Sequence, residues 1–435
     1  MFKKLSAPIN VQWELTTWCN HNCIYCYNYW RGNTDSSAHL SAEQRKIYTI
    51  AAKEFIKNGI FYVTLTGGEP LNVIEQVIDI IYPMKKAGIS IGINTNLTLL
   101  DQKKADLLKS LGIKGILTSL QSADERINDQ LAQQDGAYKR TLMGMNLAIK
   151  NGFDVSINMV VTKINLHTIR DTGKLAKSLG AHTFSATKAA TPFNCADFSE
   201  YELDNEDFSQ MLMDLLWIND TLEMKVDTLE HYPSCSFPND EVRNILGSRT
   251  CSAGKTGCTV GFDGQIRPCS HAHVTYGNIM DGLKNAWDKM EQWRDGSLIP
   301  SICKDDCKAY PFKCGGGCRI EAFLKKGKLT ESDPLCKHIK PLNSQNFKKK
   351  NKLPPDVLVT LANDVKFRSE DFGYIAYGNS HHWLPIDNNL YEILQSTILN
   401  GSIKAEDIAC AYEIDKNDAI EIIQALVSKQ IVKII

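Results

Sequence analysis

The sequence lacks any long apolar run and any excess of charge of one sign. Its 435 residues contain no stretch of about 18 apolar residues, so we expect no membrane span. The first residues, MFKKLSAPINVQWELT, have no apolar core of the length that a signal peptide needs. With 49 Lys and Arg against 50 Asp and Glu, the net charge of −1 offers nucleic-acid phosphates no basic face. We expect a cytoplasmic protein that binds neither membranes nor nucleic acid.

Cysteine, in contrast, is abundant, and it is clustered. The chain has 14 cysteines, three of them between residues 19 and 26 and eight between residues 251 and 336. Thiols stay reduced in the cytoplasm, where grouped cysteines bind metal more often than they form disulfides. The remaining Cys195, Cys235 and Cys410 are isolated, and we expect them to be buried as small hydrophobic residues.

Strand-like and helix-like segments alternate from about residue 10 to residue 190. The six strand-like segments are residues 11–16, 62–68, 90–96, 114–120, 154–161 and 182–188. The first helix begins with Ser41 and Gln44 in capping-box spacing, and glycines such as Gly59 end the helices. The alternation predicts an α/β fold with a parallel sheet, a partial (β/α)6 barrel. In such barrels the loops after the strands carry the chemistry.

Four regions follow from these patterns. We expect the barrel at residues 1–190 and a bridging region at 191–250, with a helix around FSQMLMDLLWIND. Residues 251–347 are rich in cysteine and glycine and fold around metal. A linker, KKKNKLPPD, precedes a small β-then-α domain of winged-helix type at residues 355–435.

The first cysteine group has the spacing C-x-x-x-C-x-x-C and directly follows the first predicted strand. Thiolates are the natural ligands of [4Fe–4S] clusters, and Cys19, Cys23 and Cys26 can hold three irons, which leaves the fourth iron open. The alternative is a zinc site in which His21 is the fourth ligand.

A second motif, GGEP at residues 67–70, closes the second predicted strand. Gly67 and Gly68 can bring bare backbone close to a ligand, although Glu69 and Pro70 also suit an ordinary turn into a helix. Together with the cysteine spacing, and with Tyr25 before the third cysteine, this motif resembles the radical S-adenosylmethionine (SAM) family.

That resemblance implies a cofactor and a reaction. The open iron chelates the methionine part of SAM, and one electron cleaves SAM to a 5′-deoxyadenosyl radical that abstracts a substrate hydrogen. Cys19, Cys23 and Cys26 then hold the catalytic cluster, and the residues matched so far to the cofactor site are Tyr25, Gly67, Gly68, Glu69 and Pro70.

Two further segments resemble the family in part. Thr95 and Asn96 match its TNG segment, with Leu97 in place of the glycine. TSLQS resembles its S-L-D-G segment, with Gln121 and Ser122 in place of Asp and Gly. The resemblance makes Thr95, Asn96, Ser119 and Arg140 contacts of SAM and turns the backbone of NMVVT toward the adenine. Arg140 fits a solvated helix position equally well.

The second cysteine group resembles the SPASM extension of radical SAM enzymes. Cys251, Gly264 and Cys269 have the spacing C-x12-G-x4-C, in which TVGFDGQIRP reads as a hairpin. CKDDCKAYPFKCGGGC and a late cysteine follow, with two gaps one residue longer than the SPASM pattern. The resemblance implies two auxiliary [4Fe–4S] clusters, three clusters in all. Cys251, Cys269 and Cys318 hold the first, and Cys303, Cys307, Cys314 and Cys336 the second. Cys258 is either a fourth ligand of the first cluster or a bystander, and a zinc ribbon is the alternative for the whole segment.

The C-terminal pattern is similar to the PqqD-like recognition element of ribosomal-peptide (RiPP) maturases. Such a domain binds the leader of a precursor peptide by adding it as a strand to a sheet edge. A winged helix for packing or for DNA is the alternative, but the acidic stretches SEDFG and AEDIACAYEID argue against DNA.

The leading hypothesis is therefore a peptide maturase that forms a C–C, C–O or thioether crosslink, as in the darobactin and cyclophane types, with flavodoxin or ferredoxin as electron donor. A sulfatase maturase would carry Asp after Cys269, where this chain has Ser270. A peptide epimerase would use a cysteine such as Cys195 or Cys235 as hydrogen donor. The non-enzyme alternative is a zinc-bearing binding protein. His271 and His273 are candidate proton acceptors.

Overall fold

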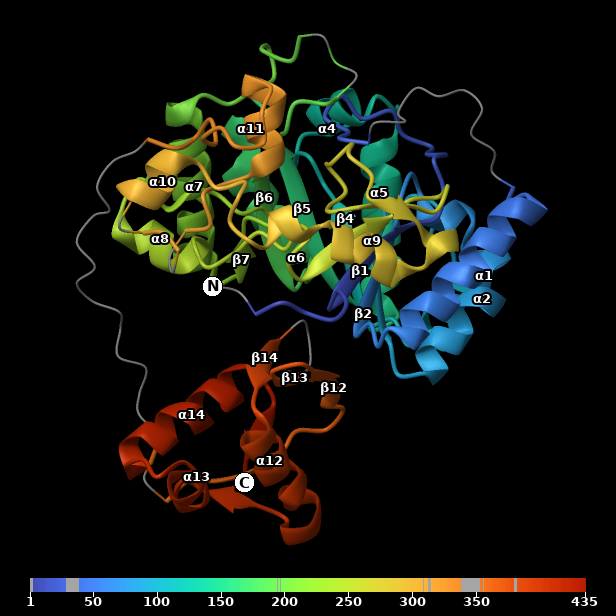
Figure 1. Cartoon of the computed structure of the whole chain (residues 1–435). Helices are drawn as coiled ribbons and strands as arrows, with labels where there is room; N and C mark the ends of the chain where they lie inside the picture. Colours follow the sequence, from blue (N-terminus) through green and yellow to red (C-terminus); the bar gives the residue numbers. More distant parts are fainter. Residues whose placement is uncertain are drawn as a thin grey trace. The chain divides into compact units, whose positions relative to one another are not determined.

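The structure is a computed structural model that describes residues 3–28, 39–193, 195, 197–307, 309–311, 314–337, 353–354, 356–378 and 382–435 (Figure 1). It divides into two compact units. The first spans residues 7–344, and the second comprises residues 345–435 together with Lys3–Ser6. Most of the linker expected at residues 348–356 lies outside the described residues.

The first unit is built on one ten-stranded sheet with the order β10-β9-β8-β1-β2-β3-β4-β5-β6-β7. Six of its strands are the ones the sequence predicts: β1 (Asn10–Glu14), β2 (Tyr62–Thr66), β3 (Ser90–Asn94), β4 (Gly115–Ser119), β5 (Asp154–Val161) and β6 (Thr183–Lys188). Each pairs in parallel with the next. The short strand β7 (Val226–Asp227) extends the sheet beyond β6, also in parallel. The predicted α/β alternation is confirmed.

Helices connect these strands: α1 (Ala42–Lys57), α2 (Ile74–Lys86), α3 (Gln102–Ser110), α4 (Glu125–Ala132), α5 (Ala137–Lys150) and α6 (Ile169–Leu179). The predicted capping box of α1 is present, because the Gln44 N–H donates to Ser41 Oγ and the Ser41 N–H donates to Gln44 Oε1. The ring of Trp13 on β1 packs edge-on against Tyr48 and Phe55 of α1, with centroids 5.5 and 5.4 Å apart. This apolar contact fixes α1 against the strand that leads into the first cysteine group.

The cysteine-rich segment continues the same sheet. β8 (Gly257–Val260) pairs in parallel with β1, β9 (Gln265–Arg267) pairs antiparallel with β8, and β10 (Gly277–Asn278) pairs antiparallel with β9. The predicted hairpin is confirmed, with Gly264 at φ +80° in its turn. The helices of the cysteine-rich segment are α9 (Leu283–Lys289), α10 (Ser301–Asp305) and α11 (Arg319–Lys326). The preceding region contributes α7 (Asn205–Leu222), which contains the helix predicted there, and α8 (Asp240–Leu246).

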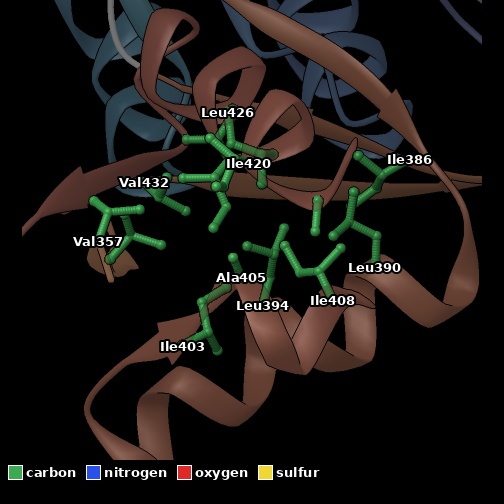
Figure 2. Close-up of a cluster of buried hydrophobic side chains, with 14 of the residues drawn as sticks. Val357, Ile386, Leu390, Leu394, Ile403, Ala405, Ile408, Ile420, Leu426 and Val432 are labelled. Atoms are coloured by element: carbon green, nitrogen blue, oxygen red, sulfur yellow. The ribbon is translucent and has the colours of Figure 1, made fainter. Parts of the chain in front are cut away.

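Among its described residues, the second unit has two three-stranded sheets and three helices. β11 (Leu358–Leu361) lies between β15 (Ile403–Lys404) and β16 (Val432–Ile434), and β12 (Lys366–Glu370), β13 (Gly373–Tyr377) and β14 (Trp383–Ile386) form an antiparallel meander. The helices are α12 (Asn388–Asn400), α13 (Ala405–Tyr412) and α14 (Lys416–Ser428). Aliphatic side chains from both sheets and all three helices form the core, among them Leu394, Ile408 and Leu426 (Figure 2).

No helix within the described ranges has the length and apolar character needed to cross a bilayer.

Candidate functional site

The first cysteine group lies on the loop that follows β1, at the carboxyl ends of the parallel strands. The Leu15 N–H donates to the Thr66 carbonyl at 2.8 Å, which extends the β1–β2 pairing. Further along, the N–H groups of Asn22 and Ile24 donate to the carbonyls of Ala132 and Leu131 at 3.1 Å. The loop is therefore anchored at β2 on one side and at the end of α4 on the other.

The GGEP turn carries this loop. The Gly68 N–H donates to the Thr16 carbonyl at 2.6 Å, and the Asn28 side-chain amide donates to the Gly67 carbonyl at 2.9 Å. A Cβ atom on Gly67 would lie 2.5 Å from the Thr16 carbonyl oxygen, and one on Gly68 would overlap the Trp18 carbonyl. The glycines thus permit a close approach between two backbone segments. Their partner in this structure is the cysteine loop itself.

Glu69 joins the turn to the end of β3. Its buried carboxylate accepts hydrogen bonds from Thr95 Oγ1 at 2.6 Å, from the Asn96 N–H at 2.8 Å and from the Leu71 N–H at 2.9 Å. Burial raises the pKa of Glu69 to about 7, although these hydrogen bonds lower it. Pro70 begins the short 3-10 helix Pro70–Asn72. The predicted pairs Glu69–Pro70 and Thr95–Asn96 therefore meet in one hydrogen-bonded network.

Asn96 reaches from this network to the cysteine loop. Its side-chain amide donates to Asn20 Oδ1 at 2.8 Å, and the Asn20 amide donates to Thr98 Oγ1 at 2.7 Å. Leu97, which stands where the resembled motif has glycine, is fully buried and adopts φ 61°. Leu97 therefore adopts a left-handed backbone conformation, which glycine favours more than leucine does.

The remaining predicted SAM contacts have different surroundings. Ser119 ends β4, is half-buried, and pairs with Asn158 of β5. Arg140 is exposed on α5 and donates to the Asp135 carbonyl at 2.9 Å. The pKa of His21 is lowered to about 4, mainly by burial and in part by the positive charge of Arg140. Arg140 therefore lies near the cysteine loop.

Gln121, whose role the sequence left in doubt, is 2% exposed and ties β4 to β5. Its Oε1 accepts from the Val160 N–H at 2.7 Å, and its carbonyl accepts from the Asn165 amide at 2.8 Å. Its Nε2 has no hydrogen-bond partner among the described residues. Gln121 therefore organises the backbone of the NMVVT segment.

The three thiols of the first group surround Tyr25. Burial raises the pKa of the Tyr25 hydroxyl, and the charges of Cys23, Cys26 and Cys19 raise it further. Cys19 is exposed, whereas Cys23 and Cys26 are half-buried. Three neighbouring thiols with access from outside fit the donor set of a cluster that has one open iron.

Tyr27 connects this loop to the SPASM-like hairpin. Its ring stacks on His271 with centroids 4.2 Å apart, and its side chain hydrogen-bonds to Ser270. His271 Nε2 in turn lies 3.6 Å from Glu230 Oε1, and the ring of His273 lies 3.8 Å from that of Phe193. The first cysteine group and the segment after Cys269 are therefore neighbours.

Cys251, Cys269 and Cys318 lie together. Burial raises the pKa of Cys269 to about 12, and the charge of Cys251 adds to this rise. Burial, followed by Glu230, Glu321 and Cys251, raises the pKa of Cys318. Cys258 lies in β8 opposite Val11, and burial raises its pKa to about 12.

Cys303, Cys307, Cys314 and Cys336 form the other group. A hydrogen bond from Cys336 lowers the pKa of the Cys303 thiol, while burial and the charges of Cys314 and Cys307 raise it. Cys303 and Cys314 are buried. A fifth thiol is present, because Cys235 Sγ lies 3.3 Å from Cys336 Sγ.

The expectation that the isolated cysteines are buried is wrong. Cys235 is half-buried against Cys336, and Cys195 is also half-buried. Cys410 is exposed, because α13 turns Ala405 and Ile408 toward the core. Contacts between cysteines far apart in the chain leave no signal in spacing.

Two buried residues that the sequence analysis missed link the cysteine groups. Asp333 accepts from the Cys318 N–H at 2.6 Å through its carboxylate and from the Cys336 N–H at 2.9 Å through its carbonyl. A Cβ on Gly317 would lie 2.5 Å from Asp333 Cβ. The last glycine of the CGGGC motif therefore lies where the Asp333 side chain comes close to the backbone. Arg319, 4% exposed, donates to the carbonyls of Leu298, Leu329, Glu331 and Gly316.

Within the described ranges, no three His, Cys, Asp or Glu side chains are arranged to hold a metal ion.

Comparisons with known proteins agree with this geometry. Residues 13–176 match the model of the Radical SAM superfamily. An AdoMet-dependent heme synthase of Methanosarcina barkeri is 29% identical in an alignment of 361 positions that covers 77% of this chain and 98% of that protein. The mycofactocin maturase MftC of Mycolicibacterium smegmatis is 24% identical over 76% of this chain and 83% of its own length.

Two solved structures share the fold. SuiB of Streptococcus suis bound to precursor peptide SuiA has a TM-score of 0.59 at 19% identity and covers 77% of each chain. The enzyme anSMEcpe with bound AdoMet has a TM-score of 0.61 at 20% identity, covering 76% of this chain and 94% of that one. The sheet and helices described above therefore share the α/β fold of these two structures.

Proposed function

Residues 13–176 match the model of the Radical SAM superfamily, and from that premise we propose that the chain is an enzyme that modifies a ribosomally made peptide by closing a crosslink within it. One observation carries the proposal. The loop of Cys19, Cys23 and Cys26 rests on the GGEP turn at the carboxyl ends of the strands, beside the hairpin that bears Cys269. Chemistry in such sheets belongs at this edge.

The family implies a [4Fe–4S] cluster and SAM, and we assign the cluster to Cys19, Cys23 and Cys26. When bound, these groups supply a carbon radical that removes a hydrogen atom from the substrate. The chain's own residues hold the site in place. Glu69 and Asn96 fix the cysteine loop, and Gln121 fixes the Val160 backbone that we expect beside the adenine. Ser119 and Arg140 are proposed as polar contacts of SAM.

We assign two auxiliary [4Fe–4S] clusters to the other thiol groups. Cys251, Cys269 and Cys318 form the first ligand set, and Cys258, on the strand β8 that pairs with β9 just before Cys269, is either its fourth ligand or a bystander. The second set is Cys303, Cys307, Cys314 and Cys336. Arg319, a buried cation whose charge lowers the pKa of Cys303, offsets the negative charge of thiolate ligands there.

A peptide substrate is supported by the kinds of protein that resemble this chain. Mycofactocin maturase and the PqqA peptide cyclase of Methylocella silvestris both match about three quarters of it. In the second unit, β12 and β14 each pair only with β13 among the described strands. Such edges accept an added strand, so we propose that this unit binds the leader of the precursor peptide.

The crosslink removes two hydrogens from the peptide. One leaves as an atom, and the other leaves as a proton together with an electron. His271, held between Tyr27 and Glu230, is placed to accept a proton beside Cys269. The bond type, C–C, C–O or thioether, and the electron donor, a flavodoxin or ferredoxin, remain part of the proposal.

A second candidate is SAM-dependent haem synthesis. The heme synthase of Methanosarcina barkeri matches this chain over 98% of its own length, which favours a shared chemistry. The two candidates differ in substrate class, and the second unit has a role only in the first.

The test is anaerobic incubation of the chain with SAM, a reductant and a short peptide encoded beside its gene. A loss of two hydrogens per modification, with fragment ions that fail to separate at one residue pair, supports the crosslink. The Cys23→Ala variant is the control and should leave the peptide unchanged. Unchanged mass with deuterium uptake from heavy water means epimerisation, and SAM cleavage with no peptide change overturns the peptide proposal.

A further inference from the structure

The second auxiliary ligand set contains one thiol more than a cluster needs. Four thiolates saturate a [4Fe–4S] cluster, yet Cys235 lies 3.3 Å from Cys336, sulfur to sulfur. These two residues are 101 positions apart in the sequence. The charge of Cys235 also raises the pKa of Cys314, which places Cys235 beside a second member of the set.

The segment of Cys235 is firmly anchored. It forms a short 3-10 helix, Ser234–Ser236, in which the Ser236 N–H donates to the Pro233 carbonyl at 2.9 Å and Ser236 Oγ donates to it at 2.7 Å. Ser236 is fully buried, and the Ser234 N–H hydrogen-bonds to the Cys314 thiol. Ser234 and Ser236, the neighbours of Cys235 in sequence, thus hold it beside the second set of cysteines.

Cys336 is held from the opposite side. Its N–H donates to the carbonyl of Asp333, whose carboxylate also accepts from the Cys318 N–H. Its thiol contacts that of Cys303. A [4Fe–4S] cluster offers four irons to thiolates, so only four of these five thiols can ligate it at once. Cys235, with its sulfur 3.3 Å from that of Cys336, lies where it could take the place of Cys336.

We propose that Cys235 and Cys336 share one iron of the second auxiliary cluster, so that either thiol completes its ligand set. The proposal rests on the auxiliary cluster assigned above. The exchange replaces one iron–sulfur bond with another. The arriving thiol gives up a proton and the departing thiolate takes one up, so no oxidant or reductant is consumed.

The experiment measures iron and acid-labile sulfide per full-length chain after anaerobic reconstitution, together with the electron paramagnetic resonance spectrum of the reduced protein. Four chains are compared with the unaltered one: Cys235→Ala, Cys336→Ala, the double variant and Cys307→Ala. Cys410→Ala, which removes an exposed thiol in the second unit, is the matched control.

We expect about 12 irons in the unaltered chain, four for each cluster. Each of the two single variants keeps about 12 irons, and Cys336→Ala changes the spectrum of one cluster because its ligand has changed. The double variant and Cys307→Ala each fall to about eight irons. Thermal melting of the double variant separates loss of one cluster from loss of the fold.

Three results overturn the inference: loss of about four irons from Cys336→Ala alone, the same loss from Cys235→Ala alone, or a double variant that keeps about 12. Each of these leaves the proposed function standing. An unaltered chain with only about four irons, or with zinc in their place, instead removes the auxiliary clusters on which both proposals depend.

Discussion

At the scale of the residue, the candidate site depends on buried groups that support the cysteine loop. Glu69 accepts three hydrogen bonds at the junction of β2 and β3, and Gly68 leaves room for the Trp18 carbonyl. The two residues act on the same loop, one through hydrogen bonding and the other through the absence of a side chain. Each allows a sharp prediction.

Glu69→Gln should destabilise the chain by about 1–3 kcal/mol, because an amide NH2 replaces an oxygen that accepts from buried N–H or O–H donors. Urea denaturation under anaerobic conditions measures the free energy of unfolding. Glu75→Gln is the matched control: Glu75 pairs with Lys103 at the surface, and its change should stay within about 0.5 kcal/mol. Equal stability of the two variants would contradict this role of Glu69.

Gly68→Ala should displace the cysteine loop, because its Cβ overlaps the Trp18 carbonyl. We expect loss of about four irons per chain, those of the SAM-binding cluster, with the other irons retained. Gly115→Ala is the control, since a Cβ there has no described atom within 4 Å. A Gly68→Ala chain with full iron content would show that the loop tolerates the movement.

At the scale of the element, the pairing of β8 with β1 joins the hairpin that precedes Cys269 to the parallel sheet. Across this junction Arg267 of β9 and Glu14 of β1 form an ion pair in which both side chains are at most 1% exposed. Arg267 also donates to the carbonyls of Ser270 and Ala272, next to Cys269. The Arg267–Glu14 ion pair therefore fixes the end of the hairpin against β1 of the parallel sheet.

Arg267→Ala should cost about 3–5 kcal/mol, because it leaves Glu14 buried without its cation. Chemical denaturation checks this value. The double variant Glu14→Gln/Arg267→Met removes both charges and should recover most of the loss. If the double variant is as unstable as the single one, packing rather than charge pairing accounts for the effect.

The buried carboxyl groups of Glu14 and Glu69 make the stability of the fold depend on pH. Burial raises the pKa of Glu14 to about 7 against the pull of Arg267, and burial raises that of Glu69 to about 7. A carboxyl whose pKa is higher in the folded state than in the unfolded state binds more protons when folded. These groups therefore stabilise the fold fully below about pH 4.5, and the stabilisation is lost as pH rises toward 7. Glu14→Gln should flatten the fall in unfolding free energy between about pH 5 and pH 7.5, and an unchanged slope would contradict the assignment.

At the scale of the whole molecule, the two units divide the proposed tasks. All cysteines assigned to clusters lie in the first unit, and β12 and β14, which we propose for leader binding, lie in the second. A chain without residues 345–435 should keep its iron and its SAM cleavage while its affinity for the precursor peptide falls at least about tenfold, or about 1.4 kcal/mol. Fluorescence anisotropy with a labelled peptide measures this. Unchanged affinity would place leader binding in the first unit.

Local patterns in the sequence predict much of this protein, because local geometry decides them. The capping box at Ser41, the Asp263–Gly264 hairpin turn and the six alternating strands depend on neighbouring residues, and all are present in the structure. The assignment of the cysteines to three clusters, which rests on their spacing, stays a prediction.

The sequence by itself determined the strand–helix alternation, the GGEP turn and the identity of the thiol donors. Only the tertiary structure decided that β8 pairs with β1, that Cys258 lies opposite Val11, and that Asp333 joins two cysteine groups. It also brought Cys235 to Cys336 across 101 positions. These contacts arise from the closure of long loops and from packing between distant segments, and no pattern of neighbouring residues encodes them.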